Sequence, residues 1–298
     1  MKKYNVAILA YRSGRSRVFE TYRGKKLPFS ELRLLASKRS AGKEIAFMGK
    51  TYTVEEATFD SFKGIDIALF AGGSISKDFA PHAVKAGAVV IDNSSAFRMD
   101  PEVPLVVPEV NPQAILKHKG IIANPNCSTI IMVMALKPIY DLAKIKRVIV
   151  STYQAVSGAG KEGIDELDAQ VREHSEGREM TANILPSASA EKHYPIAFNL
   201  IPQIDVFCDN LYTKEEMKMV NERKKLWKDY EMRITATTIR VPVYRSHSES
   251  VNIELEKEVD LGAMREALAK FPGVTVQDDP SKQEYPMRYI LLKKTMFM

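Results

Sequence analysis

Cys127 stands where a loop turns into a helix, which is a place where a thiol can act as a nucleophile. The run NPNCST at 124–129 is followed by the apolar stretch 130–136, and this pattern predicts a helix that begins at Cys127. The first N–H groups of a helix have no partner within it, so they favour thiolate over thiol. Asn126 is a suitable N-cap, and its amide could donate to an oxyanion beside the sulfur. The alternative interpretation is that Cys127 is only a small buried side chain at a helix start.

Composition limits the kind of protein this can be. The chain has 298 residues, of which 45% are hydrophobic and 27% charged, which is typical of a globular protein of about two domains. No stretch reaches the roughly 18 apolar residues of a membrane span, and the N-terminus lacks a signal peptide pattern, so we expect a cytoplasmic protein. Cys127 and Cys208 are too few for a disulfide framework and lack zinc-site spacing, so we expect no metal.

The net charge of +6 is unevenly distributed along the chain. Residues 10–27 carry a net charge of +5 and residues 288–298 a net charge of +3, so the remainder carries −2. A protein that follows phosphates spreads basic residues over one face of its folded body, and here that body is slightly acidic. We therefore expect no binding to nucleic acid.

The order of apolar patterns predicts an α/β fold with two domains. The first half has short strand patterns and two helical patterns, which predict a Rossmann-type dinucleotide-binding domain over residues 1–126. The second half has longer strands, which predict an α+β catalytic and dimerisation domain over residues 127–298. The expected strands are 6–10, 32–36, 65–70, 88–91, 121–123, 147–154, 233–243 and 250–256, and the expected helices are 77–86, 112–119, 161–173, 213–227 and 261–271.

Several motifs together resemble those of bacterial aspartate-semialdehyde dehydrogenases. They are NPNCST at 124–129, QAVSGAG at 154–160, RVPV at 240–243 and SHSE at 246–249. The resemblance runs in order over about residues 1–9 and 28–287 and includes IDNSSAFR at 91–98. Agreement of this many separate motifs in the right order is not expected by chance.

The resemblance implies an NADP-dependent enzyme that interconverts aspartate 4-semialdehyde and 4-phospho-aspartate, with inorganic phosphate as the other small-molecule substrate. This reaction lies on the route to lysine, threonine, methionine and diaminopimelate. The resemblance also implies a homodimer or a dimer of dimers. One alternative is an enzyme like N-acetylglutamyl-phosphate reductase, although Asn126 and Ser128-Thr129 around Cys127 fit the aspartate enzyme better. Another is an inactive dimerising pseudoenzyme.

The resemblance also assigns catalytic roles. Cys127 would attack the aldehyde to form a thiohemiacetal, hydride would pass to the nicotinamide, and phosphate would cleave the resulting thioester. His247 resembles the general acid and base, and Gln154 would orient the substrate near the sulfur. Asn126 would contribute the amide beside the nucleophile. Without the family, a histidine in a serine-rich turn is more often a solvated loop residue.

Four further residues are implied as substrate ligands. Arg240 would clamp the α-carboxylate with its planar fork, Glu215 would bind the amine, and Lys218 with Arg98 would bind the phosphate. Without the family, Arg240 is a surface charge at a strand end, and Glu215 with Lys218 is an exposed helical ion pair. Arg240 and His247 are seven residues apart, which places them on opposite faces of a straight strand. Pro242 or the turn 245–248 must therefore redirect the chain if both face one substrate.

Two groups of residues are implied as cofactor ligands. Ser37, Arg39 and Ser40 follow the second predicted strand, where a guanidinium distinguishes NADP from NAD by its 2′-phosphate. In the second half, Ser157, Gly158 and Gly160 would let the backbone approach the nicotinamide ring.

The chain departs from the family pattern at two places. The first is the segment after the first strand, residues 10–27, whose first part, 10–20, has a single glycine and three arginines where the family has a glycine-rich turn that binds pyrophosphate. The sequence from 288 also diverges, where the family continues into a strand and a long helix that returns to the nucleotide domain. We interpret both as shifted reading frames, and we expect impaired NADP binding and activity in this chain.

Overall fold

The computed structural model describes residues 2–10 and 28–288. By their internal contacts, the chain forms two compact units, Met1–Asn126 and Cys127–Met298, which are treated separately below. Within the described residues, no helix combines the length and apolar character needed to cross a membrane.

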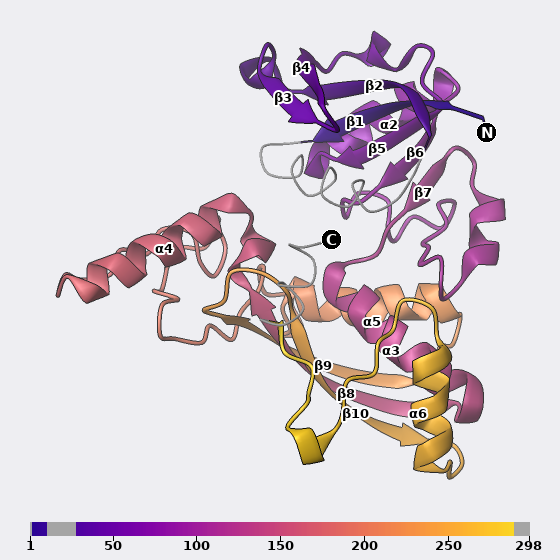
Figure 1. The fold of residues 1–298 in the computed structure, drawn as a ribbon, viewed down its shortest axis with the longest axis vertical. Coiled ribbons are helices and arrows are strands. Elements are labelled where there is room, and N and C mark those ends of the chain that lie inside the picture. Colours follow the sequence, from indigo (N-terminus) through magenta and orange to yellow (C-terminus); the bar gives the residue numbers. More distant parts are fainter. Residues whose placement is uncertain (1, 11–27, 289–298) are drawn as a thin grey trace. The chain divides into compact units, whose positions relative to one another are not determined.

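The N-terminal unit contains a seven-stranded sheet (Figure 1). Six strands run parallel, in keeping with the expected Rossmann-type arrangement, and β3 adds one antiparallel strand at the edge, where it forms a hairpin with β4. The strand order is β3-β4-β2-β1-β5-β6-β7. The strands are β1 (Tyr4–Ala10), β2 (Phe29–Ala36), β3 (Glu44–Phe47), β4 (Lys50–Glu56), β5 (Ile67–Ala71), β6 (Val89–Asp92) and β7 (Ile121–Ala123).

The hairpin β3-β4 was missed by the sequence prediction. Most of its side chains are exposed, so the run has little of the apolar alternation by which a strand is recognised. The sequence signal available for this hairpin was Gly49 in its two-residue turn. Met48 and Gly49 both have positive φ, at 48° and 76°, as a type I′ turn requires.

Helices of the N-terminal unit lie in the connections between strands. Among the described residues of this unit, the α-helix is α2 (Ser76–Lys85), and the 3₁₀ helices are η1 (Lys38–Ser40), η2 (Phe59–Phe62), η3 (Gly73–Ile75) and η4 (Pro112–Lys117). The predicted helix at 112–119 is therefore wrong in type and length. Asn111 does not cap it, because its side-chain oxygen accepts from Val107 N and its amide donates to Leu105 O.

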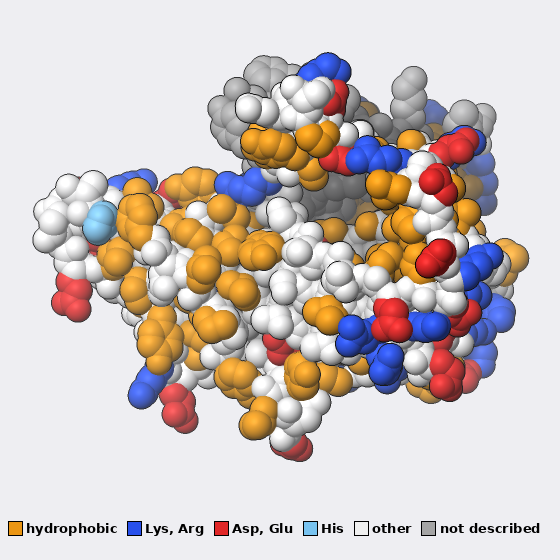
Figure 2. Space-filling model, turned by 90° about the horizontal axis from the view of Figure 1, so that it is seen from below, with side chains coloured by type: hydrophobic (Ala, Val, Ile, Leu, Met, Phe, Trp, Pro, Cys, Tyr) orange, Lys and Arg blue, Asp and Glu red, His pale blue; other side chains and the backbone are white. Residues whose placement is uncertain are grey.

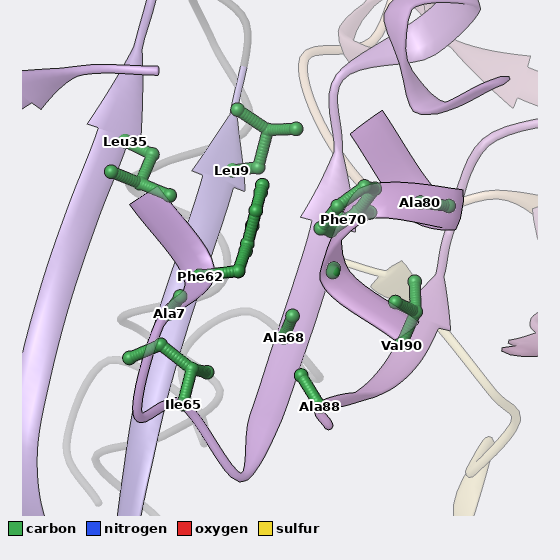
Figure 3. Packing of buried hydrophobic residues seen from close by; sticks show 11 residues of the cluster. Ala7, Leu9, Leu35, Phe62, Ile65, Ala68, Phe70, Ala80, Ala88 and Val90 are labelled. Atoms are coloured by element: carbon green, nitrogen blue, oxygen red, sulfur yellow. The ribbon is translucent and has the colours of Figure 1, made fainter. Parts of the chain in front are cut away.

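One apolar cluster forms the core between the central strands and the connections around α2 (Figure 3). Phe62 and Phe70 are the largest side chains in it, and both are almost fully buried, with ring centroids 5.6 Å apart. The other members are Ala7, Leu9, Leu35, Ile65, Ala68, Ala80, Ala83, Ala88 and Val90. This packing holds β1, β5 and β6 in register and so fixes their carboxyl ends, where dinucleotides bind in such sheets.

The C-terminal unit contains a three-stranded sheet in the order β10-β8-β9, with β9 parallel and β10 antiparallel to β8. Helices α3 and α5 pack against this sheet (Figure 1). The elements are α3 (Cys127–Ala143), β8 (Ile145–Ala155), η5 (Val156–Ala159), α4 (Lys161–Ser175), α5 (Lys214–Trp227), β9 (Arg233–Val241), β10 (Ser248–Leu255), α6 (Leu261–Lys270) and η6 (Pro280–Lys282).

The middle strand β8 shows which face of the sheet meets the helices. Val148, Val150, Thr152 and Gln154 are buried, whereas Ile149 and Tyr153 between them are exposed. The strand predicted to run to residue 243 instead ends at Val241, because Pro242 has no N–H to donate to a ladder.

Candidate active site

Cys127 is the first residue of α3 and its side chain is exposed. The prediction of a helix beginning there is confirmed, and the alternative of a buried structural side chain is wrong. The next two residues, Ser128 and Thr129, are fully buried and anchor this end of the helix. The sulfur therefore lies in reach of solvent and reactants, at the positive end of the helix dipole.

Gln154 and Arg240 lie opposite each other on β8 and β9, near the carboxyl ends of these parallel strands. Both are buried, with exposed fractions of 1% and 4%. The amide of Gln154 is held at each end, because its oxygen accepts from Thr152 Oγ1 at 2.9 Å and its nitrogen donates to Glu215 Oε1 at 3.2 Å. A polar pair at this depth, with a fixed orientation, is placed to hold a reactant.

The guanidinium of Arg240 has unused hydrogen-bonding capacity. Nη1 donates to Ala155 O at 2.8 Å, whereas buried Nε has no hydrogen-bond partner among the described residues. Burial lowers the pKa of Arg240, and the negative charges of Glu215 and Cys127 act in the opposite direction. The interpretation of Arg240 as a surface charge is wrong. A buried cation with free donors is suited to bind a carboxylate.

His247 reaches the same backbone residue as Arg240. Its Nδ1 accepts from Ala155 N at 3.1 Å, so a neutral imidazole carries its proton on Nε2. The chain turns back through Ser246, which has a φ of 70°. The redirection that the spacing demanded is therefore present, and His247 is a half-buried, hydrogen-bonded residue rather than a solvated one.

Glu215 and Lys218 form a largely buried ion pair rather than the exposed pair of the alternative interpretation. Lys218 Nζ lies 3.0 Å from Glu215 Oε2 and 2.9 Å from Asp205 Oδ2. Burial alone would lower the pKa of Lys218, but the two carboxylates outweigh it and raise that pKa. Burial would likewise raise the pKa of Asp205, yet the hydrogen bond from Lys218 leads to a net decrease. Asp205 was missed by the sequence analysis, because no motif connects it to a lysine 13 positions away.

The start of α5 is tied to the sheet by a capping box. Thr213 Oγ1 accepts from Glu216 N at 3.3 Å, and Glu216 Oε2 accepts from Thr213 N at 2.7 Å. The other oxygen of Glu216 accepts from Thr238 N at 3.0 Å. This contact to β9 places Glu215, in the first turn of α5, beside the sheet. The spacing T-x-x-E at 213–216 was the available sequence signal.

The loop after β8 carries the predicted nicotinamide contacts. Ser157 is buried and its N–H donates to Tyr244 O at 3.1 Å, while Val156 N donates to Val243 O at 2.9 Å. Gly160 has a φ of 86° and is the N-cap of α4. This positive φ favours glycine for conformational reasons, whereas the reason for glycine at Gly158 is space beside Arg240.

The predicted site residues of the N-terminal unit lie at strand ends. Ser37 and Arg39 are exposed and Ser40 is buried in η1, directly after β2. Arg98 is buried and donates to Asn124 O at 2.9 Å and to Asn93 O at 3.0 Å, which joins the segments after β6 and β7. Asn126 is buried as well. The roles predicted for these residues stay predictions.

The C-terminal unit therefore combines an exposed thiol at a helix start with a buried guanidinium, a fixed amide and an imidazole. A thiol nucleophile and a proton donor are the groups required for acyl transfer through a thioester, and the guanidinium is suited to bind a carboxylate of the reactant.

Comparison with known proteins agrees with this chemistry. Residues 17–118 match the family model described as semialdehyde dehydrogenase, NAD binding domain, and residues 136–297 match the one described as semialdehyde dehydrogenase, dimerisation domain. The chain is 54% identical over 289 residues to an aspartate-semialdehyde dehydrogenase of Aquifex aeolicus, covering 95% of this chain and 83% of that protein. It is 52% identical to the Bacillus subtilis protein of that name, covering 91% of this chain and 79% of that protein.

A solved structure supports the same assignment. Aspartate semialdehyde dehydrogenase II of Vibrio cholerae, complexed with ASA, superposes with a TM-score of 0.87 at 45% identity, covering 92% of this chain and 81% of that chain. The predicted fold class, a Rossmann-type domain with a dimerisation domain, is thereby confirmed. The chain belongs to the aspartate-semialdehyde dehydrogenase family.

Proposed function

We propose that this chain catalyses the NADP-dependent, reversible reductive dephosphorylation of 4-phospho-aspartate to aspartate 4-semialdehyde. The observation that supports this most directly is the meeting of Arg240 and His247 at Ala155, in a unit whose exposed thiol heads α3. The relatives named above carry the same activity in their names. Each group has one task in this reaction.

Cys127 is the nucleophile. Its sulfur attacks the acyl carbon of 4-phospho-aspartate, the carbon–oxygen bond to phosphate breaks, and phosphate leaves with the electron pair, so that a thioester remains. The hydride would come from a bound nicotinamide in this direction and return to it in the reverse one. When the aldehyde is released, the carbon–sulfur bond breaks and the thiolate returns to the start of α3.

His247 handles the proton at the reacting oxygen. The hydrogen bond from Ala155 N to Nδ1 holds the neutral ring with its proton on Nε2, which can donate a hydrogen bond to that oxygen. Transfer of a whole proton uses the imidazolium form, in which Nδ1 is protonated and the hydrogen bond from Ala155 N is released; this form gives its Nε2 proton when the tetrahedral alcohol forms, and Nε2 takes one back when the aldehyde carbonyl forms.

The remaining groups bind the substrate. Arg240 binds the α-carboxylate through its guanidinium, and Glu215 binds the α-amine. Lys218 stays an ammonium because its pKa is raised, and it is the cation of this unit that we assign to phosphate. Arg98, in the N-terminal unit, is the second residue assigned to phosphate.

NADP fits the N-terminal unit because its ligands stand where parallel sheets bind dinucleotides. Ser37 and Arg39 follow the carboxyl end of β2, and β2 pairs directly with β1. The exposed guanidinium of Arg39 would contact the 2′-phosphate, and Ser157 with Gly160 would lie along the nicotinamide.

A second copy of this chain is the proposed partner, since the family model of residues 136–297 is a dimerisation domain. The loop after α4 exposes Phe198 at 69%, Leu200 at 56% and Leu211 at 83%. Figure 2 shows hydrophobic side chains gathered on the side of the molecule where α4 lies. Apolar surface of this kind is typical of a contact between subunits.

The test is phosphate-dependent reduction of NADP with aspartate 4-semialdehyde, compared with N-acetylglutamate 5-semialdehyde. We expect turnover with the aspartate compound only, and loss of turnover in Cys127→Ala but not in Cys208→Ala. Alkylation and peptide mapping of the folded protein should label Cys127 first, because Cys208 is partly buried and lies in a loop. Preference for the acetylated substrate, or equal labelling of both cysteines, would contradict the proposal.

A further inference from the structure

Gly158 leaves room for the guanidinium of Arg240. A Cβ built there with ideal geometry would lie 2.5 Å from Nη1 of Arg240, 3.4 Å from Cζ and 3.5 Å from Nη2. The backbone of Gly158 does not have the left-handed φ that favours glycine, so another residue could adopt its conformation. Glycine is therefore required at position 158 because a larger residue would overlap with the side chain of Arg240.

Hydrogen bonds fix the backbone at Arg240 and the backbone of the loop before Gly158. Arg240 is hydrogen-bonded to Ile201 through both its N–H and its C=O, at 2.9 and 3.1 Å, and it also lies in the ladder with β8. The loop before Gly158 is tied to the segment after β9 by the N–H groups of Val156 and Ser157. An added methyl group would therefore displace the movable part, which is the guanidinium.

Displacement of the guanidinium would change its hydrogen bonding. Nη1 now donates to Ala155 O at 2.8 Å, which leaves the buried Nε unpartnered among the described residues. Because a guanidinium is planar, the bond from Nη1 determines the direction of the other donors. A carboxylate that accepts two of these donors needs them at one place and one angle.

We propose that Gly158 is a positioning residue that holds open the space in which Arg240 presents its fork to the substrate carboxylate. The inference rests on the proposed function and reassigns Gly158, which the family resemblance implies as a nicotinamide contact. The two assignments predict different effects of a substitution at Gly158. A positioning role predicts weaker binding of substrate, whereas a nicotinamide contact predicts weaker binding of cofactor.

The test is Gly158→Ala, with KM for aspartate 4-semialdehyde, kcat and the Kd of NADPH measured separately. We expect KM to rise about tenfold or more, the loss that follows from about 1.4 kcal/mol of weakened charged hydrogen bonding, with the Kd of NADPH within about twofold of wild type. In an Arg240→Ala background, Gly158→Ala should have no further effect on KM, since its action passes through Arg240. A raised Kd of NADPH with unchanged KM would overturn the proposal.

Gly177→Ala is the matched control. An added Cβ at Gly177 meets nothing within 4 Å, but its φ of 69° makes alanine strained, so this variant should lose stability and keep its KM. It separates a general cost of replacing glycine from the specific effect on Arg240.

A readout without turnover separates this inference from the proposed function. The ¹⁵N–¹H resonance of Arg240 Nε, assigned by its loss in Arg240→Lys, should shift in Gly158→Ala and stay in place in Gly177→Ala. An inactive chain with this shift would contradict the proposed function and support the positioning role. An unshifted resonance in Gly158→Ala would overturn the positioning role whatever the activity.

Discussion

Individual side chains of the site are held in one orientation by contacts to neighbouring residues. Gln154 is fixed by Thr152 and Glu215, His247 accepts from Ala155 N through Nδ1, and Arg240 donates to Ala155 O through Nη1. Each orientation follows from a hydrogen bond to a neighbouring strand or helix. Substitutions at these residues should therefore change binding or proton transfer more than folding.

Arg240→Lys keeps the charge and removes the planar fork. We expect kcat/KM for aspartate 4-semialdehyde to fall about tenfold to a hundredfold, which corresponds to the loss of one charged hydrogen bond. Labelling of Cys127 by an alkylating reagent should stay unchanged. Arg233→Lys is the control, because Arg233 lies at the exposed start of the same strand. Unaltered kinetics in Arg240→Lys would show that the fork does not bind substrate.

Glu249 is a half-buried residue whose two carboxyl oxygens are buried, and the reaction assigns it no role. It lies opposite Thr152 on the face of the sheet that meets the helices, and no described residue donates a hydrogen bond to either of its buried oxygens. Burial raises the pKa of Glu249 from 4.5 to about 8. The folded protein therefore holds this proton more tightly than the unfolded chain does.

The pH dependence of the Tm of Glu249→Gln, compared with wild type, tests whether Glu249 is protonated in the folded protein. The contribution of the neutral acid is fully present below pH 4.5, the ordinary pKa, and is lost as the pH rises through about 8. The variant should therefore match wild type at low pH and unfold at a higher Tm at about pH 9, where wild type carries a buried charge. Glu254→Gln, at an exposed position of the same strand, is the control. Equal Tm values across this range would contradict the buried charge.

At the scale of elements, the site depends on how helix starts are joined to strands. Helix α3 begins at Cys127, and α5 begins at a capping box that also contacts β9 through Thr238. The first turns of α3 and α5 therefore lie at the end of the three-stranded sheet where Gln154 and Arg240 lie.

Thr213→Ala tests the joint at α5. Loss of this buried N-cap should lower the free energy of unfolding by about 1–2 kcal/mol, and it should also raise KM because Glu215 follows in the first turn. Asp260→Ala removes the exposed N-cap of α6 and should cost less, with KM unchanged. Equal effects of the two substitutions on stability and KM would indicate that the cap does not position Glu215.

At the scale of the whole molecule, we predict that the sequence between β1 and β2 limits the affinity for NADP. Residues 11–27 and 289–298 lie outside the described residues, so the predicted departures from the family pattern there remain predictions. The sequence 10–20 contains one glycine, whereas backbone approach to a pyrophosphate at this place depends on several.

Replacement of residues 10–27 by a glycine-rich turn should lower the Kd of NADP by at least about tenfold, equivalent to 1.4 kcal/mol. Titration calorimetry with the present and the replaced chain measures this directly. Binding of NADP by the present chain as tight as by the replaced one would mean that the arginine-rich segment substitutes for the glycines.

Local sequence patterns alone predicted several helices and strands of this protein. The apolar run after Cys127 predicted the start of α3, and short apolar runs predicted five parallel strands, because such patterns depend only on which face of an element is buried. The motifs then indicated the family, and the comparisons confirmed that the chain belongs to it.

Tertiary structure alone decided how the site is assembled. The meeting of Arg240 and His247 at Ala155, and the pairing of Lys218 with Asp205, join residues from separate elements and loops. Such contacts depend on strand register and on turns through residues of positive φ, and neither is encoded in local hydrophobic periodicity. The reason for glycine at position 158 follows only from the position of the Arg240 side chain, because no local sequence pattern encodes which side chain lies beside it.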